Sequence, residues 1–392
     1  MNAGPVTDGS TRDDVDLDDL AALALLDPGE MLRAIATAGA QVREAAQLDD
    51  DLLAPLRADD RPRAVLLTGM GGSGIVADVA AAVAGRSCPV PVIAYRGHRL
   101  PGWVGPMDLV VAVSCSGGTE ETLTVLDEAV RRGARVVTVG AAGSRLASRS
   151  EHGRVLHLAV DARGRMPRAN LWGLAVPVLL VMDAVGLAQV SRRDLETLAD
   201  ELDSISARCG PGSDSAVNPA KRLALQLVGS LPYVWGSSDL AAVAAARFAA
   251  QLAENAKYPA VHGALTEVHH NQVVVMAGRF GALAEEDDDI FRDRVEDEGP
   301  GQHLRMRLLL LRDTDEIPEV AVRRAATHGL AAQYDVPVEE VTAEGDHAVS
   351  RLASLVAPLD FASAYLALVQ GIDPSPIEPI VVLKSEGAGG SR

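Results

Sequence analysis

The sequence predicts an α/β fold of two tandem units, each a parallel β-sheet flanked by helices in a doubly wound arrangement. Two observations predict it. Short, mostly apolar segments alternate with helical ones, which is the pattern of a parallel sheet covered on both faces. The alternation pauses at a Gly/Pro/Ser-rich junction, RCGPGSDSAVNP at 208–219, and then starts again. With 392 residues, the chain is long enough for two or three folding units.

The first 50 residues are expected to form an acidic tail followed by a helix. The first twenty residues contain six aspartates and one arginine. Residues 27–48 fit a helix in which Asp27 is the N-cap and Pro28 takes the first helical position, where proline is well tolerated.

Residues 51–207 are expected to form the first unit. Its predicted strands are 63–69, 89–95, 108–114, 134–140 and 154–160, with helices at 75–85 and 121–133. The apolar segment 171–190 contains Pro177 and Asp183. Because a membrane-spanning helix needs about 20 apolar residues with few or no charges, we predict a buried core helix here.

Residues 220–392 are expected to form the second unit, ending in C-terminal helices. Its predicted strands are 231–237, 273–278, 304–311 and 336–343, with helices at 239–258, 320–330 and 347–371. Residues 285–298 carry nine acids and two arginines. Such a charge run is typical of a solvated loop, so 285–299 is expected to be an insertion.

Charge and composition exclude several classes of function. A formal net charge of -18 leaves no basic face for nucleic acid. The N-terminus lacks the basic and apolar start of a signal peptide, so we expect a cytoplasmic protein without membrane contact. Cys88, Cys115 and Cys209 have no metal-binding spacing and are expected to be buried thiols in a reducing compartment.

The first turn from a strand into a helix is rich in glycine, with GMGGSG at 69–74. Glycines let the backbone approach a ligand closely, and a helix N-terminus offers N–H groups to an anion. The spacing satisfies the dinucleotide fingerprint, but the second strand ends in Tyr95-Arg96, without the acid that would bind the ribose. An NADP-dependent oxidoreductase therefore stays open as a minority alternative, and so does a tight turn with no ligand.

A second loop, SCSGGT at 114–119, follows another strand and leads into a helix. The hydroxyls of Ser114, Ser116 and Thr119 could hold a phosphate monoester there, although Ser and Thr at a helix start are often only caps. A dinucleotide site does not need this second hydroxyl cluster. Two such loops in one parallel sheet therefore favour a phosphosugar. The candidate phosphate-binding residues are Gly71, Gly72, Ser73, Ser114, Ser116 and Thr119.

Six motifs resemble, in the same order, those of the bifunctional phosphoglucose/phosphomannose isomerases, which belong to the sugar isomerase (SIS) superfamily. The resemblance extends from about residue 60 to the C-terminus. It implies two tandem SIS subdomains and a homodimer with active sites near the subunit interface. The motifs are TGMGGSGIVAD, SCSGGTEETL, PRANLWGL, ENAKYPA, EVHHNQ and GIDPSPIEPIVVLK.

Interconverting an aldose phosphate and a ketose phosphate moves a proton between C1 and C2 through a cis-enediolate. The reaction needs a carboxylate base, an acid–base group at the ring oxygen, and a cation near the developing oxyanion. The resemblance implies that Glu254 is the base and that His270, contributed by the partner subunit, helps to open the ring. An imidazole suits this task because it titrates near neutrality. Without the resemblance, Glu254 would be interpreted as a solvated helix glutamate.

The resemblance also implies two catalytic cations. Lys384 would assist ring opening, and Arg168 would stabilise the enediolate because its charge is permanent. Lys384 is one of only three lysines, whereas Arg168 is distinguished from the other arginines only by its motif. The adjacent His269 and His270 could bind a metal, but no third ligand has the usual spacing, so we expect no metal. We also expect no cofactor, because the carbonyl of the substrate itself acidifies the neighbouring C–H.

The leading hypothesis is therefore an intramolecular oxidoreductase. It would interconvert glucose 6-phosphate, with mannose 6-phosphate as a further candidate substrate, and fructose 6-phosphate. Cys115, Gly118, His269 and Gln272 depart from the family pattern. They raise a second hypothesis, a non-catalytic or regulatory SIS protein that binds phosphosugars. The joint presence of all the implied acid–base residues favours the enzyme.

Overall fold

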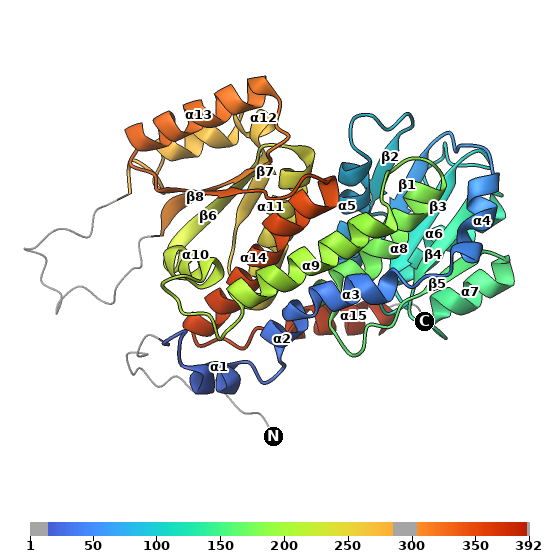
Figure 1. The fold of residues 1–392 in the computed structure, drawn as a ribbon, viewed down its shortest axis with the longest axis horizontal. Coiled ribbons are helices and arrows are strands. Elements are labelled where there is room, and N and C mark those ends of the chain that lie inside the picture. The colour runs from blue at the N-terminus through green and yellow to red at the C-terminus, as the bar shows by residue number, and fades with distance from the viewer. Residues whose placement is uncertain (1–14, 285–303, 390–392) are drawn as a thin grey trace, which may run out of the picture.

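The computed structural model describes residues 15–284 and 304–389. The acidic stretch 285–298 and most of the expected tail lie outside these residues. Two parallel sheets, each flanked by helices, lie side by side (Figure 1). The predicted fold class is confirmed.

The first sheet has five parallel strands in the order β2-β1-β3-β4-β5. Its two central strands, β1 and β3, are buried along their whole length, as their unbroken apolar sequences lead one to expect. The strand order reverses between β1 and β3, and ligands of such sheets bind beside the strands' carboxyl ends at this switch point. The strands are β1 (Val65–Thr68), β2 (Val92–Tyr95), β3 (Leu109–Ser114), β4 (Arg135–Gly140) and β5 (Leu156–Ala159).

Five helices belong to the first unit: α5 (Ile75–Ala84), α6 (Glu120–Arg131), α7 (Arg145–Gly153), α8 (Leu171–Ala184) and α9 (Arg192–Cys209). Helix α8 is buried at every position except Asp183. The core helix predicted for this segment is therefore confirmed.

The second sheet has four parallel strands in the order β7-β6-β8-β9. They are β6 (Ser230–Gly236), β7 (Val261–Ala264), β8 (Arg305–Arg312) and β9 (Val338–Thr342). The order reverses between β6 and β8, which gives this sheet a switch point of its own. The helices are α10 (Pro219–Leu227), α11 (Asp239–Gln251), α12 (Leu265–Val268), α13 (Pro318–Gln333), α14 (Ala348–Val369) and α15 (Glu378–Gly389).

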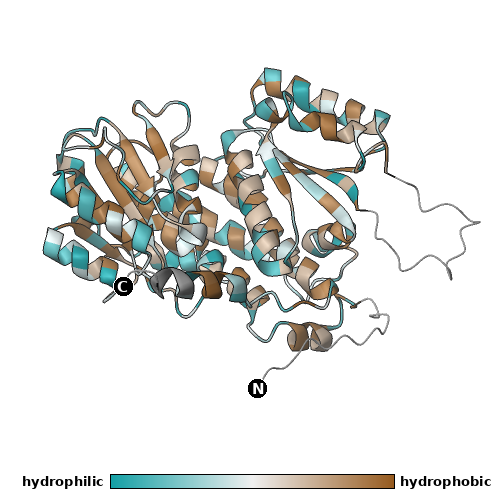
Figure 2. Ribbon diagram, turned by 180° about the vertical axis from the view of Figure 1, so that it is seen from behind, coloured by the Kyte–Doolittle hydropathy of each residue, from teal (hydrophilic) through white to brown (hydrophobic). Residues whose placement is uncertain are grey.

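One large hydrophobic core joins the two sheets and includes Val111 of β3, Val234 of β6 and Phe361 of α14. Apolar residues line the strands and the helices between the sheets (Figure 2). Among the described residues, α14 alone is long and apolar enough to cross a membrane, but 89% of its most apolar window is buried inside the protein. Helix α14 is thus placed as a core helix.

The N-terminal helices differ from the prediction of one helix over 27–48. The chain forms α1 (Leu20–Leu26), α2 (Met31–Ala36), α3 (Ala38–Ala45) and α4 (Asp50–Ala58). Pro28 precedes α2 instead of starting a helix. The Asp27 carboxylate nevertheless accepts hydrogen bonds from the backbone N–H groups of Met31 and Leu32, at 2.8 and 2.9 Å. Asp27 therefore satisfies the start of a helix that begins three residues after the predicted first helical residue, Pro28.

The strand predicted over 273–278 is wrong, because this segment forms a 3-10 helix, η4 (Gln272–Ala277). The edge position beside β6 is taken by the short strand β7, which the sequence did not suggest. The side chain of Asn271 caps η4, and Met276 anchors it in the core. Tertiary packing thus overrides the β-propensity of three consecutive valines.

Candidate active site

The two expected anion-binding loops meet at the switch point of the first sheet. Ser73, in the loop after β1, is buried, and its Oγ accepts a hydrogen bond from the backbone N–H of Cys115 at 3.0 Å. In the loop after β3, the Oγ of Ser114 and the Oγ1 of Thr119 lie 3.0 Å apart. The Oγ of Ser116 is exposed and accepts from a backbone N–H within its own loop at 3.3 Å. The bond between Ser73 and Cys115 joins the two loops, which lead into α5 and α6, and the other two bonds lie within the second loop.

Gly72 brings the first loop against the segment that carries Arg168. A Cβ at position 72 would lie 2.9 Å from the backbone nitrogen of Arg168 and 2.9 Å from the carbonyl carbon of Pro167. Only glycine fits between these backbone atoms. A Cβ at the neighbouring Gly71 would meet no atom within 4 Å, but the φ of this residue is +54°, in the left-handed region.

The Arg168 guanidinium is 2% exposed and makes contacts on every side. Its Nε donates to Asn255 Oδ1 at 2.7 Å, and its Nη2 donates to the carbonyl oxygens of Pro374 and Ser375, both at 2.9 Å. Its Nη1 lies 3.5 Å from Glu254 Oε2. Burial lowers the pKa of Arg168, and Glu254 opposes that shift. The Arg168 side chain therefore links the C-terminal GIDPSP motif to the Glu254 carboxylate.

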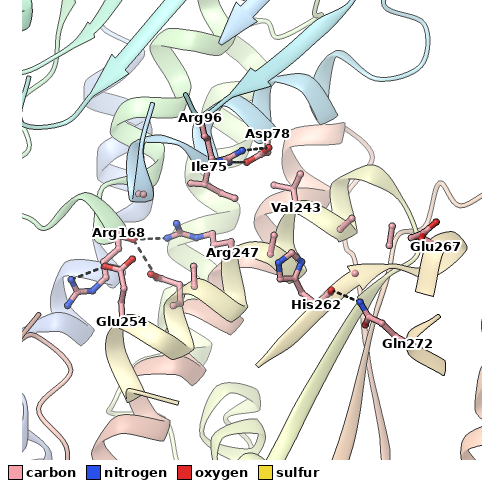
Figure 3. Close-up of a pocket in the computed structure, with 18 residues that line it drawn as sticks. Ile75, Asp78, Arg96, Arg168, Val243, Arg247, Glu254, His262, Glu267 and Gln272 are labelled. Atoms are coloured by element: carbon pink, nitrogen blue, oxygen red, sulfur yellow. Dashed lines mark hydrogen bonds and ion pairs between the residues drawn. The ribbon is translucent and has the colours of Figure 1, made fainter. Parts of the chain in front are cut away.

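Glu254 lies on a single π-helical turn, Leu252–Ala256, which continues α11. Such turns are rare and occur frequently at functional sites. The Glu254 side chain is 26% exposed, so its carboxylate reaches solvent while it stays beside Arg168. The side chains of Glu254 and Arg168 lie next to one another in the lining of the cavity shown in Figure 3.

A buried network behind Arg168 was missed by the sequence reasoning. Arg247 of α11 donates through Nη2 to the carbonyl oxygen of Arg168 and to Asp360 Oδ2, both at 2.7 Å. Gln251 donates to Asp360 Oδ1 at 3.1 Å. Burial raises the pKa of Asp360, and the Arg247 guanidinium opposes the shift. An arginine in an alanine-rich helix and an aspartate in the apolar α14 are the signals that could have revealed it.

Lys257 was also missed, although the scarcity of lysine draws attention to it. It has a φ of +54° and lies directly after the π-helical turn. Its Nζ donates to the carbonyl oxygens of Glu254 and Asn255 at 3.0 and 3.1 Å, and to that of Asp373 at 3.1 Å. Burial lowers its pKa, and the nearby Arg168 lowers it further. Lys257 and Arg168 together clamp the GIDPSP motif onto the end of α11.

A cavity of about 810 Å³ lies between the two units, and its lining includes Arg168, Arg247 and Glu254. Of the predicted site residues, Gly71, Gly72, Arg168 and Glu254 line it. The hydroxyl-bearing residues of the two loops do not. An unpredicted histidine, His262 of β7, does line the cavity (Figure 3).

The other two predicted catalytic residues are not brought to this cavity by their own chain. His270 is exposed after α12, where its backbone N–H donates to the Glu267 carbonyl oxygen at 2.9 Å. Lys384 is exposed on α15. The site as predicted is thus split into a part within the chain and a part that faces outward.

The departures from the family motif around His270 have structural partners. His269 Nε2 lies 2.8 Å from Thr327 Oγ1. Gln272 Oε1 accepts from the Trp235 indole N–H at 2.9 Å, and Gln272 Nε2 donates to the His262 carbonyl oxygen at 3.2 Å. A glutamate at position 272 could accept the first bond but could not donate the second.

The structure also bears on the two alternative ligands considered from the sequence, NADP and a metal ion. Arg96, considered for an NADP phosphate, pairs with Asp78 and donates to the Gly74 carbonyl oxygen at 3.1 Å. Within 15–284 and 304–389, no group of three or more His, Cys, Asp or Glu side chains could hold a metal ion.

Comparisons with known proteins agree with this geometry. Residues 216–386 match the bacterial phospho-glucose isomerase C-terminal SIS domain. The chain is 28% identical to the bifunctional phosphoglucose/phosphomannose isomerase of Caldicellulosiruptor bescii over 88% of this chain and 95% of that protein. It is 27% identical to the Aquifex aeolicus protein of the same name, over 83% and 90% of the two chains.

Solved structures agree at the level of the fold. The C-terminal domain of glucosamine-fructose-6-phosphate aminotransferase from Francisella tularensis has a TM-score of 0.63 and 16% identity, covering 88% of this chain and 98% of that one. The matched domain and the similarity along most of the chain confirm the resemblance seen in the motifs. Over most of its length the chain is similar to the bifunctional phosphoglucose/phosphomannose isomerases, and residues 216–386 match the C-terminal SIS domain of bacterial phospho-glucose isomerases.

Proposed function

We propose that the protein interconverts glucose 6-phosphate and mannose 6-phosphate with fructose 6-phosphate. The observation that carries this proposal is the Glu254 carboxylate, held beside the Arg168 guanidinium in a cavity next to the Gly71–Gly72 turn. The names of the similar proteins support it. The two aldoses differ only at C2, so both lead to a C1–C2 enediolate.

In the proposed reaction, Glu254 moves the proton between C1 and C2. The carbonyl of the open-chain sugar acidifies the neighbouring C–H, so the step needs a positioned base and a stabilised oxyanion. Arg168 supplies a permanent positive charge close to the base. Because its other N–H groups are bound to Asn255 and to backbone carbonyls, that charge is fixed before the substrate arrives.

The phosphate is proposed to bind at the paired helix starts of α5 and α6. Backbone N–H groups of Gly71 and Gly72 would contact it, with hydroxyls from Ser73, Ser114, Ser116 and Thr119. Helix N-termini favour anions through their unpaired N–H groups and the helix dipole. The position suits the substrate because the cavity with Glu254 begins at the same glycines.

The outward-facing His270 and Lys384 lead us to propose a homodimer in which His270 completes the site of the partner. Both side chains are exposed, and neither lines the cavity of its own chain. We further propose a cytoplasmic location, since all three cysteines are free thiols, as is typical of reducing compartments.

A coupled assay of the purified chain tests the activity. Fructose 6-phosphate formation is followed separately from glucose 6-phosphate and mannose 6-phosphate, for the wild type, Glu254→Gln and Glu319→Gln. Loss of a general base lowers kcat by about 10²–10⁴-fold, so Glu254→Gln is expected to lose that much. Glu319→Gln changes an exposed glutamate on α13 and is expected to keep full activity.

Two outcomes would overturn parts of the proposal. Full activity of Glu254→Gln would exclude this carboxylate as the base. No turnover by the wild type, together with a rise in its unfolding temperature in either sugar phosphate, would favour the non-catalytic binding protein.

A further inference from the structure

The two sheets share one architecture at their switch points. In the first, the chain leaves β1 and β3 toward opposite sides, and the loops after these strands meet. In the second, β6 and β8 have the same relation. Since the first switch point is the proposed phosphate site, the second raises the question of what its own loops hold.

The same hydrogen bond joins the loops in both units. In the first, the hydroxyl of Ser73 accepts from the backbone N–H of Cys115, the residue directly after β3. In the second, the hydroxyl of Ser237 accepts at 2.8 Å from the backbone N–H of Asp313, the residue directly after β8. Cys115 and Asp313 therefore occupy corresponding positions.

The two loops differ in the chemistry that follows this shared position. The first loop continues with Ser116 and Thr119, which can donate hydrogen bonds to an anion. The second has one hydroxyl, that of Thr314, among Asp313, Asp315 and Glu316, whose ionised carboxylates only accept hydrogen bonds. A phosphate at the second loop would therefore meet negative charge where the first loop offers donors.

Asp313 is itself bound as an anion would be. Its side chain is 3% exposed. The hydroxyl of Ser238, the N-cap of α11, donates to its Oδ2 at 2.7 Å, and Nε of Arg351 donates to its Oδ1 at 2.8 Å. The backbone N–H of Asp315 adds a third bond, at 3.2 Å. A hydroxyl, a guanidinium and an N–H next to a helix start are the donors that also bind oxyanions.

We propose that the second unit contains a second oxyanion site, which the Asp313 carboxylate occupies as an internal ligand. The site lies on a cleft of about 390 Å³ lined by Ser238, Asp313 and Arg351. One chain with two similar units then binds a single sugar phosphate. The second unit then binds no phosphate at this position. Instead, Asp313 connects the end of β8 to the start of α11 through Ser238 and to α14 through Arg351.

The inference goes beyond the proposed reaction and is tested without it. Equilibrium dialysis with labelled inorganic phosphate counts the phosphate bound per chain at saturation. The wild type is expected to bind one. The double variant Asp313→Ser/Asp315→Ser removes the internal ligand and the exposed acid that lies 3.3 Å from Arg351, and is expected to bind two.

Two controls assign the second phosphate to this site. Asp315→Ser alone reduces local negative charge but keeps the internal ligand, so it is expected to bind one. Adding Arg351→Leu to the double variant removes the cation, and binding is expected to return to one. Native folding of each variant is checked by circular dichroism and thermal unfolding.

Several results would overturn the inference. A folded double variant that binds only one phosphate would show that removing Asp313 opens no site. A second phosphate that persists without Arg351 would place it elsewhere. Two phosphates per wild-type chain would also overturn the inference, because Asp313 would then occupy no site that phosphate could otherwise take. If the double variant does not fold, Asp313→Asn/Asp315→Ser, which removes the charge but keeps the shape of Asp313, is tested in its place with the same two outcomes.

Discussion

At the scale of single residues, the candidate site depends on how closely two backbone segments approach one another. The 69–74 turn and the 167–169 turn touch at Gly72, where no Cβ fits. That contact sets where Arg168 lies, and Arg168 in turn contacts Glu254. Besides the phosphate contact proposed for its N–H group, Gly72 therefore also influences the position of the proposed base.

The adjacent glycines offer a matched test of this dependence. In Gly72→Ala the new methyl collides with backbone atoms at 2.9 Å, so the Arg168 segment must move. Because a displacement of about 1 Å can cost about 100-fold in rate, we expect kcat/KM to fall by about that factor. Gly71→Ala meets no atom within 4 Å and carries only the strain of a positive φ, about 1–2 kcal/mol.

Steady-state kinetics and thermal unfolding of both variants check this prediction. Gly71→Ala should lose stability while it keeps most of its activity. In Gly72→Ala the larger change should be the loss of kcat/KM. Equal kinetic losses in the two variants would contradict the role assigned to the Gly72 contact.

Sequence motifs marked two residues that the structure brings into contact, but they gave no sign of the polar contacts that burial alone creates. Arg168 and Glu254 both belong to recognisable motifs, and they lie 3.5 Å apart. Arg247 and Asp360 also bind one another, but neither belongs to a recognised motif, and they are 113 positions apart in the chain. Long-range polar contacts of this kind are visible only once the helices are packed.

At the scale of elements, the end of α11 positions the carboxylate that we propose as the base. Its last turn widens into a π-helical turn that carries Glu254, and the helix is fixed to α14 by the Arg247–Asp360 pair. The same Arg247 holds the carbonyl oxygen of Arg168. Helix packing and site geometry are therefore coupled through one guanidinium.

Replacing only one partner of the Arg247–Asp360 pair is expected to lower the free energy of unfolding substantially. Arg247→Met leaves the Asp360 carboxylate buried without its cation, and such a loss destabilises proteins by about 3–5 kcal/mol. Replacing both partners, as in Arg247→Met/Asp360→Leu, removes the unpaired charge and should recover most of that stability. Urea unfolding of the wild type and both variants measures the difference.

Activity separates the two roles of the pair. The double variant still lacks the hydrogen bond to Arg168, so its kcat should remain low even when its stability returns. A double variant that regains both stability and activity would show that Arg247 serves packing alone.

Element-level prediction is most reliable for buried strands and long helices. The apolar runs of β1 and β3, and the four consecutive leucines of β8, predict buried strands in an alternating α/β chain. The composition of the valine-rich segment 273–278 predicts a strand, yet Asn271 capping and the occupied sheet edge make it a 3-10 helix. Local propensity cannot report which edge of a sheet is already filled.

At the scale of the whole molecule, one chain presents an incomplete set of the predicted catalytic groups. Glu254 and Arg168 line its cavity, whereas His270 and Lys384 face outward. Helix α15, which carries Lys384, also exposes Val381, Val382 and Leu383. Clustered exposed apolar residues are typical of interaction surfaces. Both features are consistent with a second copy that covers α15 and shares its histidine.

Mixing two inactive variants tests whether the site is shared. Glu254→Gln and His270→Asn are each expected to abolish turnover, because every site in either homodimer lacks one group. After unfolding, mixing and refolding together, half of the dimers should be hybrids under closed two-fold symmetry. Each hybrid has one site with an intact Glu254 from one chain and an intact His270 from the other. Activity should therefore recover to about one quarter of the wild type.

The control is the double variant Glu254→Gln/His270→Asn mixed with wild type in the same way. Its hybrids contain Glu254 and His270 on the same chain, so neither of their two sites is complete if the histidine crosses the interface. The remaining wild-type homodimers, one quarter of the mixture, then give about one quarter of the wild-type activity. If each chain instead used its own His270, the two inactive variants would show no recovery on mixing, and the control mixture would keep about one half. The two mixtures together thus distinguish a shared site from two independent ones.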